Sequence, residues 1–509
     1  MIHHRKSKRI SIREWLVATT SGLTLAFTAW GLGGVQLWSL HVLLLGGGLT
    51  LLLALMPWPS RHRMIARGKA TSLGSGDAPF REQSPEWVTA IQRLLRWPFF
   101  WCSALYLIYL LLGAFNPAAE VVRDERGWWV EAIPPTLASW LPTSVRADYT
   151  VMNAWRVLVS FSGTCFLVWG IWAGVTRRKT SLLVLWCLLL SGVGMGMVGI
   201  LQHLTEAKEV LWNFPSSNRQ FWGSFFYRNQ GAAYLNIILV AAAFLFFYHA
   251  VKTRQRSRSG GPHFLCFFLF FITATSIGLA LSRGGILFGL LLSVVFAGLL
   301  VIYAIQSLFH VRSLALSLIT IVMLATSIYT VLTYIDYEAI EQRFGDLEEA
   351  IEGADQDARA FSTKATWDMA QDRLTLGWGA GSFRHIFPMY QRNYPEIYYN
   401  YFHKKKQQWI GRKVYRYAHN DIVQFLAEYG VIGSLFIFGG IVLLLAQALY
   451  HSGDQSFATL VLLAGVAQAF GHAFLDFIFN SPAYWMAFMG LLVTATKLLK
   501  LEQKRPHAA

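Results

Sequence analysis

Long hydrophobic stretches alternate along the chain with shorter polar segments. Twelve of them approach or exceed the roughly 20 residues that a helix needs to cross the hydrocarbon core of a membrane. The pattern therefore predicts an all-α polytopic membrane protein with about twelve transmembrane helices. They are expected near residues 16–37, 40–57, 97–115, 154–175, 181–201, 232–250, 263–282, 285–306, 313–334, 421–447, 457–477 and 484–499.

Composition agrees with this pattern. Of the 509 residues, 54% are hydrophobic and only 14% are charged, whereas an average soluble domain carries about 25% charged residues. A chain with so little charge excludes both a soluble globular protein and a disordered one. The net charge of +16 does not indicate nucleic-acid binding, because the basic residues occur in short runs between the hydrophobic stretches, as membrane topology requires.

The distribution of lysine and arginine predicts the orientation. These residues are concentrated in alternate connecting segments, such as 1–14, 58–96 and 251–262, and they are sparse in 116–153 and 202–231. Basic loops stay in the cytoplasm. We therefore expect both termini in the cytoplasm of a bacterial inner membrane and the long segment 335–420 on the periplasmic side.

The chain divides into three predicted parts. Residues 1–334 form an N-terminal bundle of about nine helices, 335–420 form one large periplasmic loop, and 421–509 form about three helices and a cytoplasmic tail. The loop is rich in tryptophan and tyrosine, which favours an ordered unit with short helices, and we expect no other loop to contain a folded unit. A helix is predicted over 361–376, followed by a glycine turn that shapes the backbone.

Two arginines lie where the predicted helices begin at the periplasmic surface. Arg283 stands in a connection with almost no loop, and a cation at that depth needs a counter-anion. Arg228 and its neighbour Asn229 open another predicted span and offer hydrogen-bond donors to an anion or a sugar. The alternatives are that Arg283 only reaches out to the interface and that Asn229 is an ordinary helix start.

The segment that opens the span near 421–447 carries the candidate base. His419 has the side chain that most readily takes a proton near neutral pH. Polar residues follow it into the membrane and are predicted to face a cavity rather than lipid. They are Asn420, Asp421, Gln424 and Glu428. The alternative is an interfacial histidine beside residues that only cap the helix.

Arginines at the rim of a helical bundle with a histidine beside them suit a particular substrate. Guanidinium groups bind diphosphate oxygens in pairs and stabilise the charge that develops on a departing diphosphate. A lipid diphosphate that carries a glycan fits this site. The sequence has no HExxH, Walker A or paired-cysteine motif, and its four cysteines lie within hydrophobic stretches; no metal or other cofactor is predicted.

Three motifs in order resemble those of the O-antigen ligase and O-antigen polymerase superfamily of bacterial envelope glycosyltransferases. They are the Ser-Arg-Gly-Gly-Ile-Leu motif at 282–287, the Leu-Gly-Trp-Gly-Ala-Gly-Ser-Phe motif at 376–383, and the Ala-His-Asn-Asp motif at 418–421 with the Glu-Tyr-Gly that follows at 428–430. The resemblance covers about residues 220–480.

This resemblance implies a metal-independent, inverting glycosyltransferase with a fold of the GT-C type. Its donor would be a glycan on undecaprenyl diphosphate, and its acceptor lipid A-core or another glycan, lipid or protein. By the same resemblance Arg283 binds diphosphate and His419 activates the acceptor hydroxyl. A further arginine is expected before the glycine turn, where Arg359 and Lys364 are both candidates.

Other functions remain open at this point. A repeat-unit polymerase of the same superfamily needs the same site as a ligase. A transporter or flippase of lipid-linked glycan also has many spans, although transporters place their polar residues near the middle of the bilayer. A scaffolding subunit leaves Arg283 and the polar stripe unexplained.

Overall fold

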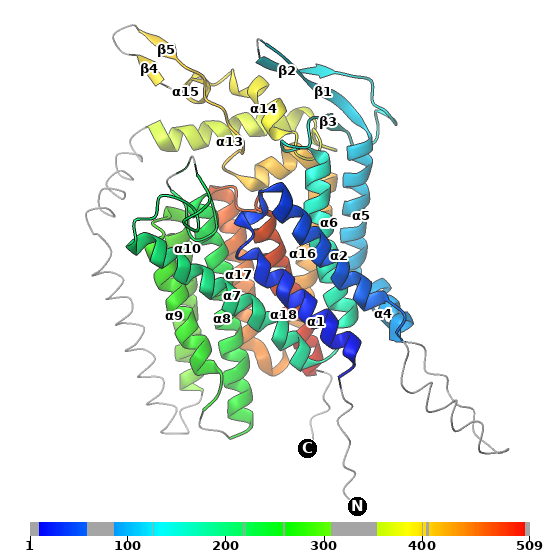
Figure 1. Cartoon of the computed structure of the whole chain (residues 1–509), viewed down its shortest axis with the longest axis vertical. Helices are drawn as coiled ribbons and strands as arrows, with labels where there is room; N and C mark the ends of the chain where they lie inside the picture. Colours follow the sequence, from blue (N-terminus) through cyan, green and yellow to red (C-terminus); the bar gives the residue numbers. More distant parts are fainter. Residues whose placement is uncertain are drawn as a thin grey trace, which may run out of the picture.

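The computed structural model is a bundle of long helices with shorter helices and small β-sheets at one end (Figure 1). It describes residues 10–58, 86–125, 127–216, 218, 220–257, 260–306, 354–399, 401–403 and 407–503. Most of this part of the chain is helical, so the predicted all-α membrane fold is confirmed.

Nine helices in the described ranges are long and apolar enough to span a membrane. They are α2 (Leu37–Leu55), α5 (Pro98–Phe115), α6 (Ala154–Gly174), α7 (Arg178–Leu204), α8 (Arg228–Gln255), α10 (Arg283–Ile305), α16 (Asp421–Tyr450), α17 (Ser456–Leu475, preceded by the 3-10 turn Gly453–Gln455) and α18 (Pro482–Gln503). Helices α1 (Ile12–Thr28) and α9 (His263–Leu279) have 17 residues each, and the amphipathic α4 spans Glu86–Leu95. The predicted span 313–334 lies outside the described residues.

The prediction of one span over 16–37 is wrong. Helix α1 ends at Thr28, and a 3-10 turn follows at Leu32–Gly34. Within that turn Gly34 has φ +73°, a conformation that glycine adopts without strain. A Cβ atom on Gly34 would lie 2.9 Å from the backbone nitrogen of Ala483. Hydrophobicity alone concealed the turn, which packs against the first turn of α18.

Polar contacts tie several helices together at one end of the bundle. The hydroxyl of Thr180 in α7 donates to Glu14 in α1 at 2.7 Å. The guanidinium of Arg178, also in α7, lies 2.9 Å from Glu502 in α18, and Lys252 at the end of α8 lies 2.7 Å from the same carboxylate. The charge pattern predicts that this is the cytoplasmic end. We call the opposite end the outer end.

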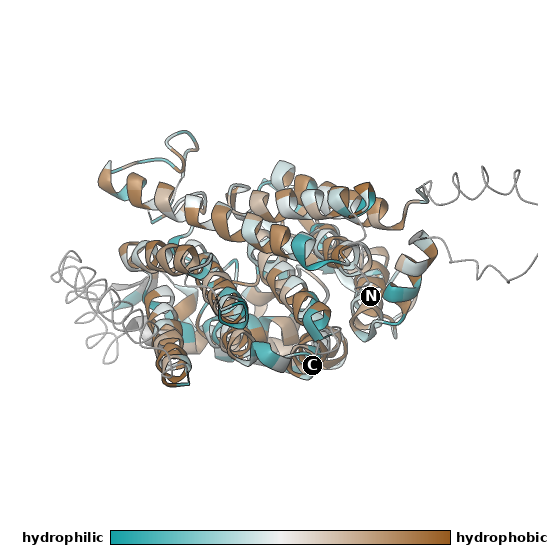
Figure 2. Cartoon of the chain, turned by 90° about the horizontal axis from the view of Figure 1, so that it is seen from below, coloured by the Kyte–Doolittle hydropathy of each residue, from teal (hydrophilic) through white to brown (hydrophobic). Residues whose placement is uncertain are grey.

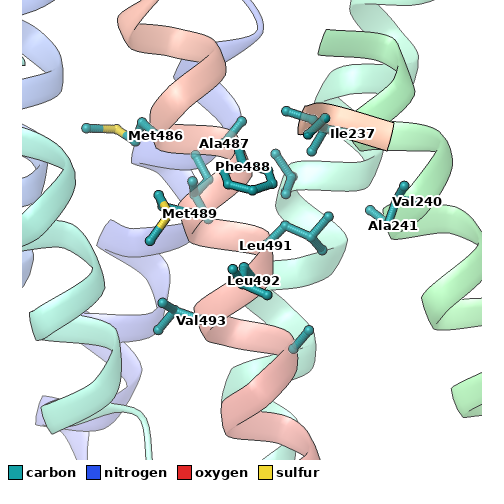
Figure 3. Packing of buried hydrophobic residues seen from close by; sticks show 14 of the residues in the cluster. Ile237, Val240, Ala241, Met486, Ala487, Phe488, Met489, Leu491, Leu492 and Val493 are labelled. Carbon is teal, nitrogen blue, oxygen red and sulfur yellow. The ribbon is translucent and has the colours of Figure 1, made fainter. Parts of the chain in front are cut away.

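Helix α8 runs through the middle of the bundle. All of its most apolar 18-residue window is buried inside the protein, against 33% for α10. Helix α18 packs beside it, and hydrophobic side chains such as Leu491 and Ile237 fill the space around the two helices (Figure 3). Because protein surrounds α8, its polar first turn is held by neighbours on several sides.

Helices α2 and α6 approach each other closely through glycines. A Cβ atom on Gly47 would lie only 2.1 Å from the carbonyl oxygen of Gly163, and one on Gly170 would lie 2.6 Å from the Thr50 side chain. Small residues of this kind allow membrane helices to pack backbone against backbone. These contacts pack α2 and α6 against each other along their middle turns.

Hydrophobic residues also cover the outward sides of many helices (Figure 2). Leu45, Leu52 and Val294 are among the large apolar side chains that remain exposed. Their exposure is expected where the surrounding medium is lipid.

The outer end carries the shorter elements (Figure 1). Strand β1 (Pro117–Asp124) pairs antiparallel with β2 (Gly127–Ala132) and parallel with β3 (Ser144–Arg146). Strands β4 (Tyr401–His403) and β5 (Gln408–Ile410) form a second, antiparallel pair. The helices here are α13 (Ala354–Asp372), α14 (Phe383–Gln391) and α15 (Pro395–Tyr398).

The expectation that only 335–420 contains a folded unit is wrong. Residues from 116–153 and from 335–420 share one hydrophobic core, in which Val145 of β3 packs with Met369 of α13 and Phe387 of α14. Strand β3 has only three residues, too few to give a recognisable alternating pattern. The predicted helix over 361–376 is present as α13, which ends four residues earlier, at Asp372.

Candidate functional site

A short loop between α17 and α18, residues 476–481, is the centre of the candidate site. The first turn of α8 holds the beginning of this loop. The side-chain amide of Asn229 donates to Oδ2 of Asp476 at 2.6 Å, and that of Gln230 donates to the carbonyl oxygen of Phe477 at 3.2 Å. The predicted polar start of α8 therefore positions the loop.

The first residues of α16 hold the rest of this loop. The side chain of Asn420 caps the helix by accepting from the backbone of Val423 at 3.2 Å. Asp421 is fully buried and accepts from the backbone of Phe479 at 2.7 Å and from the amide of Asn480 at 2.6 Å. Both side chains thus make structural contacts with the protein itself.

The next two polar residues of α16 hold other backbone segments. Gln424 accepts from the backbone N–H of Ala418 at 3.0 Å, which fixes the residue before His419. Buried Glu428 accepts from the N–H groups of Gly381 and Phe383 at 3.2 and 3.0 Å. The predicted polar stripe is therefore one face of α16, and it anchors the segments around it.

His419 lies against Asp476. Its Nδ1 atom is 3.5 Å from Oδ1 of the aspartate, and the two side chains are 28% and 5% exposed. Burial disfavours the charged carboxylate, but His419, His472 and the backbone N–H of Phe477 outweigh that effect and lower the pKa of Asp476. A buried carboxylate beside one imidazole nitrogen orients the ring and stabilises its protonated form.

Three aromatic rings stack beside this pair. The rings of Tyr417 and Phe477 are 4.6 Å apart and nearly parallel, at 14°, and Phe477 stacks in turn on Tyr227 at 5.1 Å and 9°. The His419 ring packs edge-on against Phe477 at 4.8 Å. The stack therefore connects the residue that precedes α8 with the segment that carries His419.

Two arginines act on the Tyr227 end of this stack. Burial and the charge of Asp476 raise the pKa of Tyr227, while the charges of Arg359 in α13 and of Arg228 lower it. Arg359 is exposed. These residues belong to helices far apart in the sequence, and the fold brings both charges within range of Tyr227.

Lys364, the other candidate for the phosphate contact before the glycine turn, points to a different neighbour. Its Nζ atom lies 5.9 Å from the centre of the Tyr394 ring. That ring belongs to the segment before α15, and its hydroxyl donates to Asp368 at 2.5 Å. Lys364 is therefore part of the packing between α13 and α15.

Arg283 begins α10, and its neighbour Gly284 touches α17. The hydroxyl of Ser282 caps the helix by accepting from the backbone of Gly285 at 3.2 Å. A Cβ atom on Gly284 would lie 2.7 Å from Nε2 of His472, a buried histidine one helical turn before Asp476. This contact places the exposed Arg283 at the same end of the bundle as His419.

The glycine turn shapes the backbone as predicted. Gly377, Gly379 and Gly381 have φ values of +67°, +99° and +68°, which L-residues rarely adopt. The N–H of Gly379 donates to the carbonyl oxygen of Glu428 at 2.8 Å. The turn is therefore seated directly on α16.

A cavity that is partly open to solvent adjoins Tyr417, and its space, open solvent included, is about 690 Å³. The outer ends of α2, α6, α14 and α16 surround it. Its lining includes the stack residue Tyr417, the anchor Glu428 and three arginines, Arg156, Arg384 and Arg416.

Sequence reasoning missed Asp476 and these three arginines. Asp476 stood at the end of the predicted span 457–477, where a carboxylate interrupting a hydrophobic stretch was a usable signal. Arg384 follows the glycine motif directly, and Arg416 lies three residues before His419. Arg156 carried no signal, because it stands in a part of the sequence with no recognised motif.

The fold and the site define a multi-pass membrane protein with a histidine, a buried carboxylate and several arginines gathered at one end of its helical bundle. Within the described ranges no group of three or more His, Cys, Asp or Glu side chains has the arrangement of a metal site.

Residues 268–438 match the family model of O-antigen ligase. This match confirms the resemblance that the sequence motifs predict. The match suggests a membrane glycosyltransferase of the O-antigen ligase or polymerase type. No curated protein matches the chain.

Proposed function

We propose that this protein is an O-antigen ligase-like glycosyltransferase of the bacterial inner membrane. It moves a glycan from undecaprenyl diphosphate to an acceptor hydroxyl on the periplasmic face. The observation that carries the proposal is the buried Asp476 beside His419. The charges of Asp476, Arg228 and Arg359 all act on the neighbouring Tyr227. The family match over 268–438 supports it.

His419 acts as the general base. With its Nδ1 atom turned to Asp476, the other ring nitrogen, Nε2, takes the proton of the acceptor hydroxyl. The carboxylate then stabilises the imidazolium that forms, an arrangement that contributes about 100-fold to 10,000-fold in rate in other enzymes. Asn229 holds the carboxylate in place through its 2.6 Å hydrogen bond.

Arg283, Arg228 and Arg359 bind the donor diphosphate. The acceptor oxygen attacks the anomeric carbon as the bond from that carbon to the diphosphate oxygen breaks. The electron pair of the broken bond stays on undecaprenyl diphosphate, whose added negative charge the guanidinium groups stabilise. Attack from the face opposite the leaving group inverts the anomeric centre, and the sugar arrives already activated, so no metal ion is required.

Asn420, Asp421, Gln424 and Glu428 position the site. Their hydrogen bonds fix the helix start, the loop 476–481 and the glycine turn. Lys364 serves the packing of α13. Arg359 is therefore the proposed second phosphate contact.

Deletion of the gene, followed by electrophoresis of surface glycans, tests the proposal. Complementation with the wild type restores the glycan pattern, whereas His419→Ala and Arg283→Ala do not, although both proteins insert in the membrane. His41→Ala is the matched control, because exposed His41 lies in α2 and pairs with the hydroxyl of Tyr149 at 3.0 Å. Full activity of His419→Ala in a purified transfer assay would reject the base.

The pattern of the lost glycans assigns the acceptor. Loss of all long chains from the lipid anchor indicates ligation, and single-repeat products indicate a polymerase of the same superfamily. Loss of a glycoprotein ladder indicates a protein acceptor. Translocation of lipid-linked glycan in liposomes without any acceptor would instead show a flippase and reject glycosyl transfer.

A further inference from the structure

The arginine cavity described above is a second cationic site, separate from the proposed diphosphate contacts. Arg156 donates to the backbone oxygens of Thr150 and Val35 at 3.0 and 2.7 Å, and its Nε atom is buried without a hydrogen-bond partner. No ion pair in the described part of the chain involves Arg156, Arg384 or Arg416. Three guanidinium groups therefore surround a cavity without a carboxylate partner.

The electrostatics of the neighbouring groups agree with an unbalanced positive charge. Burial lowers the pKa of Arg384, and the charges of Arg416, Arg156 and Arg123 lower it further, against a smaller opposite effect of Tyr417. Burial also lowers the pKa of the adjacent His385, and the charges of Arg384 and Arg123 lower it further. Like charges held together in this way disfavour their own ionised forms, and a bound anion relieves that cost.

Glu428 is the carboxylate in the cavity wall, and its oxygens are already engaged. They accept from the N–H groups of Gly381 and Phe383, so the carboxylate serves the glycine turn. Ser160, Gln424 and Asn480 add neutral polar groups to the lining. Guanidinium groups together with neutral polar side chains suit a ligand that carries both an anionic group and sugar hydroxyls.

The cavity lies next to the proposed base. Tyr417 lines it and stacks on Phe477, whose ring touches His419 at its edge. The charges of Arg228 and Arg359 act on the far end of the same stack, at Tyr227. The cavity thus adjoins one end of the stack, and the edge of the His419 ring packs against its middle ring.

We infer that this cavity binds the acceptor through an acidic sugar, with Arg156, Arg384 and Arg416 holding a phosphate or carboxylate group. The inference rests on the proposed function, because it names the chemistry of the acceptor for the same base. An acidic group fixed in the cavity presents a hydroxyl of the same or the adjoining sugar to His419.

Binding of small sugars to the purified full-length protein tests the inference. Equilibrium dialysis compares labelled glucose 6-phosphate, glucuronate and glucose. The wild type is expected to bind at least one of the two acidic sugars at least about tenfold more tightly than glucose, because charge-assisted hydrogen bonds are the stronger ones. The double variant Arg384→Gln/Arg416→Gln is expected to lose this preference.

Two controls separate this cavity from the donor site. Arg283→Gln/Arg359→Gln is expected to bind the acidic sugar as the wild type does while losing undecaprenyl diphosphate. Arg412→Gln removes an arginine four residues from Arg416, whose guanidinium lies over the Tyr398 ring at 5.5 Å, and it is expected to change neither affinity. Ser160→Phe fills the cavity without changing any charge and is expected to weaken binding of the acidic sugar.

Three results would overturn the inference. One is a wild type that binds both acidic sugars no better than glucose. Another is an Arg384→Gln/Arg416→Gln variant that loses undecaprenyl diphosphate and keeps the acidic sugar, which would assign the cavity to the donor. The third is displacement of glucose 6-phosphate by phosphatidylglycerol but not by glucuronate, which would assign it to a lipid head group. Binding of undecaprenyl diphosphate to Arg283→Gln/Arg359→Gln is measured separately from binding of the acidic sugar. The proposed donor contacts are therefore tested independently of the acceptor cavity.

Discussion

Gly377 and Gly430 meet backbone against backbone. A Cβ atom on either glycine would lie 2.6 Å from the backbone nitrogen of the other. Gly430 interrupts α16 with φ +61° and ψ −170°, and the N–H of Val431 donates to the carbonyl oxygen of Leu374 at 2.8 Å instead of continuing the helix. The glycine turn thus replaces part of the hydrogen bonding of α16, which joins the large loop to the helix that follows His419.

Alanine at either glycine should destabilise the protein. Both residues need a positive φ, which costs an L-residue of order 1–3 kcal/mol, and the added methyl group meets backbone atoms that cannot move aside. We expect Gly377→Ala and Gly430→Ala to lower the melting temperature in detergent and to reduce transfer. Gly439→Ala is the matched control in α16, since nothing lies within 4 Å of its added Cβ. Equal melting temperatures for all three variants would contradict this account.

Glu428→Gln tests whether Glu428 anchors the turn or takes part in the chemistry. The two carboxylate oxygens accept from the N–H groups of Gly381 and Phe383. A glutamine has only one side-chain oxygen, so its NH₂ group would face one of these backbone N–H donors without a hydrogen bond. We expect a loss of about 1–3 kcal/mol in stability, the usual cost of an unsatisfied buried group, together with lower activity. A variant with wild-type melting temperature and no activity would point to a chemical role instead.

The sequence predicts much of the fold because membrane spans have a length and a composition that can be read directly. It predicts His419 and the arginines at helix starts, because ionisable residues are costly near lipid and stand out. It does not predict the turn at Leu32–Gly34 or strand β3. Their packing contacts come from segments hundreds of residues away, Ala483 for the turn and Met369 and Phe387 for β3.

Asp476, the residue that orients His419, could not be predicted from the sequence for the same reason. Asp476 lies 57 residues further along the chain than His419, and only the folding of α8, α16 and α17 brings Asn229, His419 and Asp476 together. A single sequence contains no information on such pairs unless a motif is already known.

Asp476→Asn should reduce transfer without loss of the fold. The amide keeps the size of the side chain but removes the charge that stabilises protonated His419. We expect kcat to fall by at least about 100-fold, within the range for loss of base catalysis, with little change in the KM for the donor. Asp454→Asn, an exposed aspartate at the other end of the bundle, serves as the control. An unchanged kcat in Asp476→Asn would remove Asp476 from the mechanism.

The same carboxylate should make stability depend on pH in the acid range. The pKa of Asp476 is lowered from its ordinary value of 3.8, so the folded state binds its proton less readily than the unfolded state. Its contribution to stability is therefore full above about pH 4 and is lost as the pH falls through the folded-state pKa. The melting temperature of Asp476→Asn should fall less steeply than that of the wild type below this pH. Parallel curves would contradict the pKa shift.

Arg359→Gln and Lys364→Gln should separate the two candidates for the second phosphate contact. The charge of Arg359 acts on Tyr227 beside the loop 476–481, whereas the ammonium group of Lys364 lies over the Tyr394 ring. Loss of a charge-assisted contact to phosphate is worth about 1.5–3 kcal/mol, so the KM for the lipid-linked donor should rise at least about tenfold in Arg359→Gln. Lys364→Gln should change that KM by less than about threefold, because an exposed cation–π contact contributes at most about 1 kcal/mol. Initial rates measured against donor concentration with a fixed acceptor check both values. The reverse order of effects would assign the phosphate contact to Lys364 and place α13 differently against the donor.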